Sequence, residues 1–150
     1  MRLDNMDAIL DFAIEREEEA EAMYRRLAAE VARPGMRQTF LEFAAEEAEH
    51  KRRLEQVKAG DLPAVSEERV QDLKIADYAL ETMFSPDMNY AEALRLAMQA
   101  EKAAFKLYLN LAARASDEGL AAIFRTLAQE EAKHKLRFEI EYDEQVLEGV

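Results

Sequence analysis

The chain has 150 residues, a formal net charge of −12, no Cys, and only four Gly and three Pro. This length suits one domain with a single core, and the scarcity of helix breakers beside abundant Ala, Glu and Leu excludes a β-rich fold. The absence of Cys excludes disulfides and Cys-held metal centres, and the acidity argues against binding to nucleic acid or to an anionic membrane surface.

The N-terminal segment, residues 1–7, lacks the apolar core that a signal peptide needs. No apolar run in the sequence approaches the roughly 18 residues of a membrane-spanning helix. We therefore expect a cytoplasmic protein with no membrane segment.

Four long helical segments follow, separated by the few Gly and Pro residues of the chain. The breaks fall at Pro34-Gly35, Gly60 with Pro63, Pro86 and Gly119. The expected helices cover about residues 6–32, 36–59, 90–115 and 120–147. Because the links at 33–35 and 116–119 are short, the helices should form two antiparallel hairpins, over about residues 6–59 and 90–147.

The segment 60–89 between the hairpins is too long for a turn. Apolar residues recur in it at helical spacing, which predicts one short helix. Asn89, followed by Glu92 three residues later, makes a capping box at the start of the third long helix. The chain, residues 1–150, is thus expected to be a single all-α domain, a four-helix bundle of two hairpins joined by one long crossover.

The second hairpin repeats the first at an offset of 84 residues. This offset superposes the only two His of the chain, which a composition rich in Ala and Glu does not explain. The two halves are therefore related. The coinciding pairs include Glu17 with Glu101, Tyr24 with Tyr108, Glu47 with Glu131, and His50 with His134.

Each long helix carries an apolar stripe that alternates steps of three and four residues, as in packed helix seams. Six polar side chains interrupt these stripes, and helix geometry places all six at one height in mid-bundle. They are Glu17, Glu47, His50, Glu101, Glu131 and His134. We therefore expect one polar core layer, to which each hairpin contributes a single Glu and a Glu-x-x-His.

Four carboxylates in one buried layer cannot all stay ionised on their own, because a buried unpaired charge costs several kcal/mol. Either the layer takes up protons and holds no metal, or it binds cations. Two divalent ions balance four carboxylates, and mixed carboxylate and imidazole donors suit iron, manganese or zinc. The same donor pattern occurs in di-iron and di-manganese carboxylate bundles, so we favour the metal interpretation.

The pattern resembles the rubrerythrin-like branch of the ferritin-like superfamily. The resemblance rests on Glu17-x-x-Ala20-x-x-x-Tyr24, Glu47-x-x-His50, Glu101-x-x-Ala104-x-x-x-Tyr108 and Glu131-x-x-His134. It implies a ferritin-like bundle with two iron ions, for which manganese or zinc could substitute. By this likeness the bridging ligands would be Glu47 and Glu131, the terminal ligands Glu17 and Glu101, and the ligands to one ion each His50 and His134.

The resemblance also implies a function, that of a non-haem di-iron oxidoreductase reacting with hydrogen peroxide or dioxygen as a peroxidase or ferroxidase. Rubrerythrins proper carry a Cys-bound iron in a rubredoxin domain. Since this chain has no Cys, we expect a separate electron-donor protein, such as a rubredoxin. Ala104 stands where rubrerythrins tend to have another Glu, which predicts a symmetric site. The family resemblance further implies a homodimer.

Two other functions are compatible with the sequence. One is a protein that binds or sequesters iron or manganese with little turnover. The other is a purely structural helical module.

Two further pairs of residues lie near the expected ligands. Tyr24 follows Glu17 by two turns on the same stripe, and Tyr108 follows Glu101 in the same way. We expect each hydroxyl to form a hydrogen bond with a bridging carboxylate, with electron donation as a further role. Core aromatics whose hydroxyls simply need a partner are the alternative. Glu46 and Glu130 point about 100° away from the stripe, so we expect them in solvent, with guidance of cations toward the site as the alternative.

Overall fold

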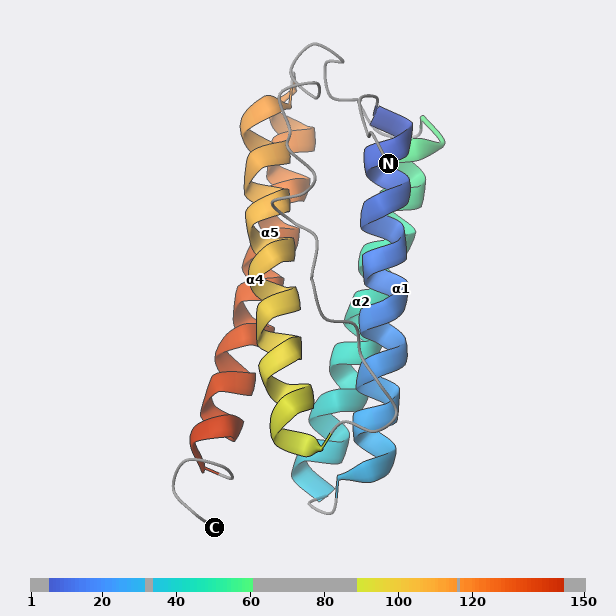
Figure 1. Cartoon of the computed structure of the whole chain (residues 1–150). Coiled ribbons are helices and arrows are strands. Elements are labelled where there is room, and N and C mark those ends of the chain that lie inside the picture. Colours follow the sequence, from blue (N-terminus) through green and yellow to red (C-terminus); the bar gives the residue numbers. More distant parts are fainter. Residues whose placement is uncertain (1–5, 32–33, 61–88, 116, 145–150) are drawn as a thin grey trace.

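The computed structural model describes residues 6–31, 34–60, 89–115 and 117–144, which form long α-helices (Figure 1). The helices are α1 (Met6–Glu30), α2 (Pro34–Lys58), α4 (Tyr90–Arg114) and α5 (Glu118–Tyr142). The all-α architecture of two helix hairpins is confirmed. The short helix expected in the crossover falls on residues 61–88, which lie outside the described part of the chain.

The helix ends follow local chemistry. Pro34 occupies the first position of α2, where its missing N–H removes no intrahelical bond. The side chain of Asn89 caps α4 by accepting a bond from the N–H of Glu92 at 2.8 Å, as the capping box predicts. Asp117 accepts a bond from the N–H of Leu120 at 3.1 Å. Because of this cap, α5 begins slightly before the expected residue 120.

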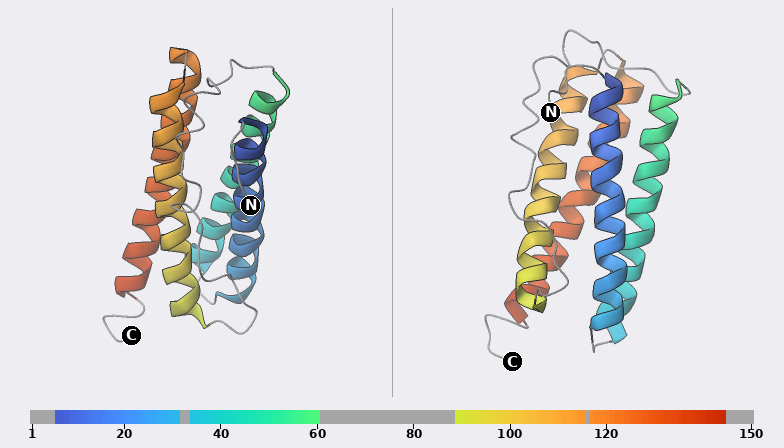
Figure 2. Two further views of the ribbon diagram at one scale, coloured as in Figure 1. Left: turned by 45° about the horizontal axis from the view of Figure 1, so that its top comes forward. Right: turned by 45° about the vertical axis from the view of Figure 1, so that its right-hand side comes forward.

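The two hairpins stand side by side with their helix axes nearly along one direction (Figures 1 and 2). α1 and α2 run antiparallel to each other, as do α4 and α5. α2 ends and α4 begins at opposite ends of the bundle, so these two helices run in the same direction (Figure 1). This is the connectivity expected for one long crossover.

Two apolar clusters fill the bundle above and below a polar layer. The first contains Leu10, Leu54, Leu111, Leu120 and Phe124. The second contains Leu27, Met36, Phe40, Leu94 and Phe138. Burial of these stripes stabilises the bundle on both sides of the polar side chains. Within the described ranges, no helix combines the length and the apolar character that crossing a membrane requires.

Candidate metal centre

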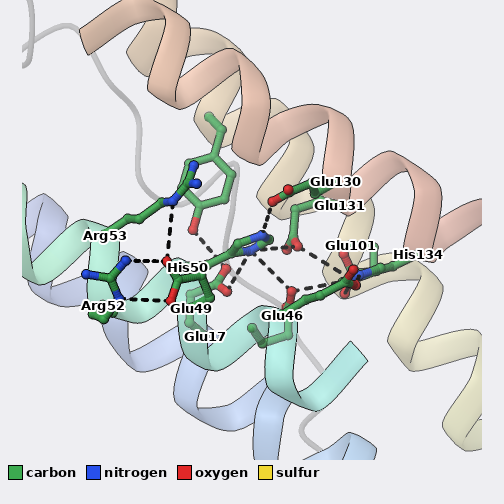
Figure 3. A network of polar contacts seen from close by, with 12 residues as sticks. Glu17, Glu46, Glu49, His50, Arg52, Arg53, Glu101, Glu130, Glu131 and His134 are labelled. Carbon is green, nitrogen blue, oxygen red and sulfur yellow. Dashed lines mark hydrogen bonds and ion pairs between the residues drawn. The ribbon is translucent and has the colours of Figure 1, made fainter. Parts of the chain in front are cut away.

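All six polar side chains expected in the core are buried and meet in one layer. Figure 3 labels five of them, all except Glu47. Each is at most 2% exposed. α1 and α4 contribute one Glu each, whereas α2 and α5 contribute a Glu and a His one turn apart. The set is Glu17, Glu47, His50, Glu101, Glu131 and His134.

The donor atoms form two overlapping groups, each with its atoms within 4.8 Å of one another. One group consists of Glu17, Glu47, His50 and Glu131, and the other of Glu47, Glu101, Glu131 and His134. Glu47 and Glu131 therefore belong to both groups, and each group has one further Glu and one His of its own. This geometry is what two adjacent cations with two shared ligands require.

Both imidazoles aim Nδ1 at the centre of this layer. Nδ1 of His50 lies 3.2 Å from a carboxylate oxygen of Glu17, 3.3 Å from one of Glu47 and 3.2 Å from one of Glu131. Nδ1 of His134 lies farther from its carboxylates, at 3.4 Å from Glu47 and 3.7 Å from Glu131. The two halves of the site are thus similar, but the distances from Nδ1 to the carboxylates are shorter around His50 than around His134.

Three Glu and both His side chains in this layer have pKa values that differ from those of the same groups in water. Burial raises the pKa of Glu17 and raises the pKa values of Glu47 and Glu131 well above their usual range, with neighbouring carboxylates adding to the effect. Burial alone lowers the pKa of each His, but the surrounding carboxylates outweigh it. They raise the pKa of His134 to about 9 and also raise that of His50.

Several buried donor atoms in the layer have no hydrogen bond. They are both carboxylate oxygens of Glu47, one oxygen each of Glu101 and Glu131, and Nδ1 of His134. Buried polar atoms are nearly always paired, and leaving them unpaired costs about 1–3 kcal/mol each. Cations held between these atoms would satisfy them and supply the missing positive charge. The residues present therefore fit a pair of divalent metal ions.

The outward nitrogens of the two His reach across to the opposite hairpin. Nε2 of His50 on α2 lies 2.5 Å from the carboxylate of Glu130 on α5, and Nε2 of His134 lies 2.5 Å from the carboxylate of Glu46 (Figure 3). The expectation that Glu46 and Glu130 stand only in solvent is therefore wrong. Each is partly exposed, at 51% and 36%, yet long enough to turn its carboxylate inward onto a buried His.

These contacts settle the orientation of each ring. A metal-binding His usually donates its other N–H to a carboxylate, which holds the ring and its tautomer. Sequence spacing alone did not reveal this role, because the bond joins residues from different hairpins. The repetition of Glu46-Glu47 as Glu130-Glu131, beside the only two His of the chain, was the available signal.

The two buried tyrosines also cross between hairpins. Tyr24 on α1 donates its hydroxyl to Glu101 on α4, and Tyr108 on α4 donates to Glu17 on α1 at 2.8 Å. The expected bond to a carboxylate is present, but its acceptor is the unshared Glu of the opposite hairpin. Burial raises the pKa values of both tyrosines well above the usual range, so both hydroxyls keep their protons.

A small cavity of about 40 Å³ lies between α1 and α4, on the side of the layer away from both His. Carboxylates from all four helices line it, and so do Ala13, Ala20, Ala100, Ala103 and Ala104. One water needs roughly 10–15 Å³ measured in the same way. The cavity therefore has room for a molecule about the size of a few waters.

The fold resembles two solved structures, each at 22% sequence identity. A protein from Thermotoga maritima, provisionally described as a ferritin-like diiron-carboxylate protein, matches with a TM-score of 0.76 over 94% of this chain and 95% of its own. A hypothetical protein from Pyrococcus furiosus matches with a TM-score of 0.74 over 92% of this chain and 88% of its own. Among curated proteins, no sequence matches this chain.

The fold and the buried layer together define a ferritin-like four-helix bundle with a carboxylate and histidine cluster in its core. The rubrerythrin family model matches residues 8–142, which is nearly the whole chain. The chain belongs to the rubrerythrin family.

Proposed function

We propose that this protein is a non-haem di-iron oxidoreductase that reduces hydrogen peroxide or dioxygen with electrons from a separate donor. The observation that carries the proposal is the pair of overlapping donor groups, buried and left partly without hydrogen bonds. The family match and the provisional description of the Thermotoga maritima relative support iron as the metal. Manganese and zinc suit the same donors.

Six side chains would hold the two ions. Glu47 and Glu131 would be shared between them, and each hairpin would complete one position with a terminal Glu and a His. When bound, two iron ions can each change oxidation state by one electron, which matches the two electrons that one peroxide takes up. The overall reaction converts one hydrogen peroxide, two electrons and two protons into two water molecules.

Four further residues hydrogen-bond these ligands and orient them. Glu46 and Glu130 accept the Nε2 protons of the two imidazoles, which leaves Nδ1 of each ring available to a cation. Tyr24 and Tyr108 donate their hydroxyl protons to Glu101 and Glu17 and restrain both carboxylates. The protein thereby fixes the ligand geometry from both hairpins at once.

The cavity between α1 and α4 supports small inorganic substrates. It reaches the carboxylates of the layer on a side where neither His lines it, so a small molecule there would approach the bound ions past the carboxylates. The alanines in its lining leave space next to the carboxylates for a molecule as small as peroxide or dioxygen.

Metal analysis followed by rapid mixing tests the proposal. Protein produced with iron should contain two iron ions per chain, and the reduced form should be oxidised quickly when mixed with hydrogen peroxide. A much slower reaction with dioxygen would identify a peroxidase, whereas an equal or faster one would identify a ferroxidase. Iron that binds but reacts slowly with both oxidants would instead support sequestration, and less than one metal ion per chain would overturn the metal site.

A further inference from the structure

The outer face of the second hairpin carries a groove with an unusual lining. The groove runs between α4 and α5, and its lining includes Lys102, Phe105, Lys106, Lys135, Leu136 and Glu139. Leu136 is 57% exposed, the highest value among the large apolar side chains that the structure describes. Leu109 and Ile140, 41% and 40% exposed, follow one turn further along the same helix faces. An apolar centre with charges around it is typical of a protein-binding surface.

The groove is basic although the chain as a whole has a net charge of −12. Three Lys stand against one Glu in its lining. Lys135 forms an ion pair with Glu139, whereas Lys102 and Lys106 have no ion-pair partner among the residues that the structure describes. The unpaired ammonium groups are therefore available to an acidic surface.

The first hairpin provides an internal control for this groove. At an offset of 84 residues, the positions of the groove and its apolar extension correspond to an outer face of α1 and α2 that includes Glu18, Glu21, Arg25, Lys51, Arg52 and Glu55. Apart from Ala22, Ala48 and Gln56, that face consists of charged side chains. Its charges pair with each other, as in Lys51 with Glu18 at 3.0 Å and Arg25 with Glu21 at 2.8 Å. The apolar and basic groove is therefore a property of the second hairpin and no consequence of the bundle fold.

The groove lies directly behind the candidate metal centre. Lys102 follows the buried Glu101, and Lys135 follows the buried His134, so each pair of neighbours connects the groove to the polar layer. The groove and the polar layer are separated by about the width of one helix, roughly 10 Å. A redox partner seated in the groove would face the metal ligands across this short path.

We propose that this groove docks a small acidic protein that carries one electron at a time. The inference rests on the proposed function and identifies where its electrons enter. Each carrier is oxidised by one electron, so two successive dockings supply the two electrons that one peroxide consumes with two protons. A second copy of this chain fits less well, because a twofold contact through the groove would set Lys against Lys.

The proposal is tested by measuring how reduced rubredoxin, an acidic one-electron carrier, binds to the protein and transfers electrons to it. In the iron-loaded protein, the double substitution Lys102→Glu with Lys106→Glu should weaken rubredoxin binding at least tenfold at low salt, as measured by calorimetry. It should slow the reduction of the iron by a similar factor. Leu136→Ala should also weaken binding without any change in charge. The matched control, Arg25→Glu with Arg52→Glu on the first hairpin, makes the same change in charge and should leave binding within twofold of wild type.

Three outcomes would overturn the docking proposal. The first is no measurable rubredoxin binding by the wild-type protein, and the second is an equal loss in the groove and control variants. The third is a wild-type dimer that Leu136→Ala converts to monomer in sedimentation experiments, because the groove would then be covered by a second copy. Wild-type protein reduced by methyl viologen and mixed with peroxide tests the proposed function separately, since viologen needs no docking surface.

Discussion

The two hairpins are alike where they face each other and unlike where they face solvent. On the inside, each supplies a Glu, a Glu-x-x-His, and a Tyr that crosses to the other hairpin. On the outside, the hairpin of α1 and α2 carries self-paired charges, whereas the hairpin of α4 and α5 carries a groove with exposed Leu136 between lysines.

The difference separates two demands on a duplicated sequence. A pair of cations between two hairpins needs matched ligands from both, so a change of a ligand in one hairpin unbalances the site. The outer faces have no such mutual constraint, so one can carry an apolar and basic groove while the other carries paired charges. The following experiments test how far the inner equivalence holds.

The largest effect is expected from the two shared carboxylates. Glu47→Gln and Glu131→Gln should each reduce bound iron from two ions to less than one per chain, because each residue belongs to both donor groups. Elemental analysis after reconstitution measures this loss. Glu49→Gln, a nearby change on the outside of α2, should keep both ions. A variant of either shared Glu that retains two ions would refute the bridging assignment.

Removing equivalent core aromatics should destabilise both halves similarly. Phe40 and Phe124 are fully buried at matching positions, so Phe40→Ala and Phe124→Ala should each lower the free energy of unfolding by about 3–5 kcal/mol. Urea unfolding of the metal-free protein gives these values. Leu41→Ala, next to Phe40 and 39% exposed, should cost less than about 1 kcal/mol. A large difference between the two Phe variants would show that one hairpin depends less on its core.

The carboxylates behind the His should have a smaller and equal effect. Glu46→Gln and Glu130→Gln should each weaken metal binding by about 10–100-fold, because the outward nitrogen of one His loses a charged acceptor. That change corresponds to roughly 1.4–2.7 kcal/mol of binding free energy. Competition with a chelator measures it, and Glu42→Gln, one turn earlier on the exposed side of α2, is the control. A metal affinity within twofold of wild type in both variants would show that Glu46 and Glu130 do not support metal binding.

Proton binding should reveal an asymmetry between the two halves of the site. In metal-free protein, His134 should lose its proton near pH 9, and His50 should do so at higher pH, because its Nδ1 lies closer to its carboxylates. Raised pKa values of His and Glu stabilise the folded state at low pH. The contribution of His134 is therefore fully present below pH 6.5 and lost as pH rises through about 9.

Two measurements check the order in which the two His lose their protons and the resulting loss of stability. NMR titration should show the imidazole signal of His134 shifting first, and the Tm of the metal-free protein should fall by several degrees from pH 6.5 to about pH 9. Bound metal should reverse this trend, because cations compete with protons for the same donors. A metal-free protein whose Tm rises over this interval would contradict the assigned protonation.

Much of the architecture follows from sequence spacing. The breaks at Pro34 and Gly119, the cap at Asn89 and the stripes with steps of three and four predict the four helices and their buried faces. The repeat of His50 as His134 predicts which polar residues share a layer. These features could be inferred because they depend on local geometry, in which a residue's place on a helix fixes the direction of its side chain.

Only the tertiary structure decided the contacts between hairpins. The choice of Glu101 as the partner of Tyr24, and of Glu46 as the partner of His134, depends on which helices face each other across the bundle. The groove behind His134 likewise exists only because Leu136 on α5 lies beside Lys106 on α4. Long side chains can turn toward several neighbours, so their partners are set by packing and not by position in the sequence. The sequence alone determined the helices and the members of the polar layer, and the packing of the two hairpins determined how those members are joined.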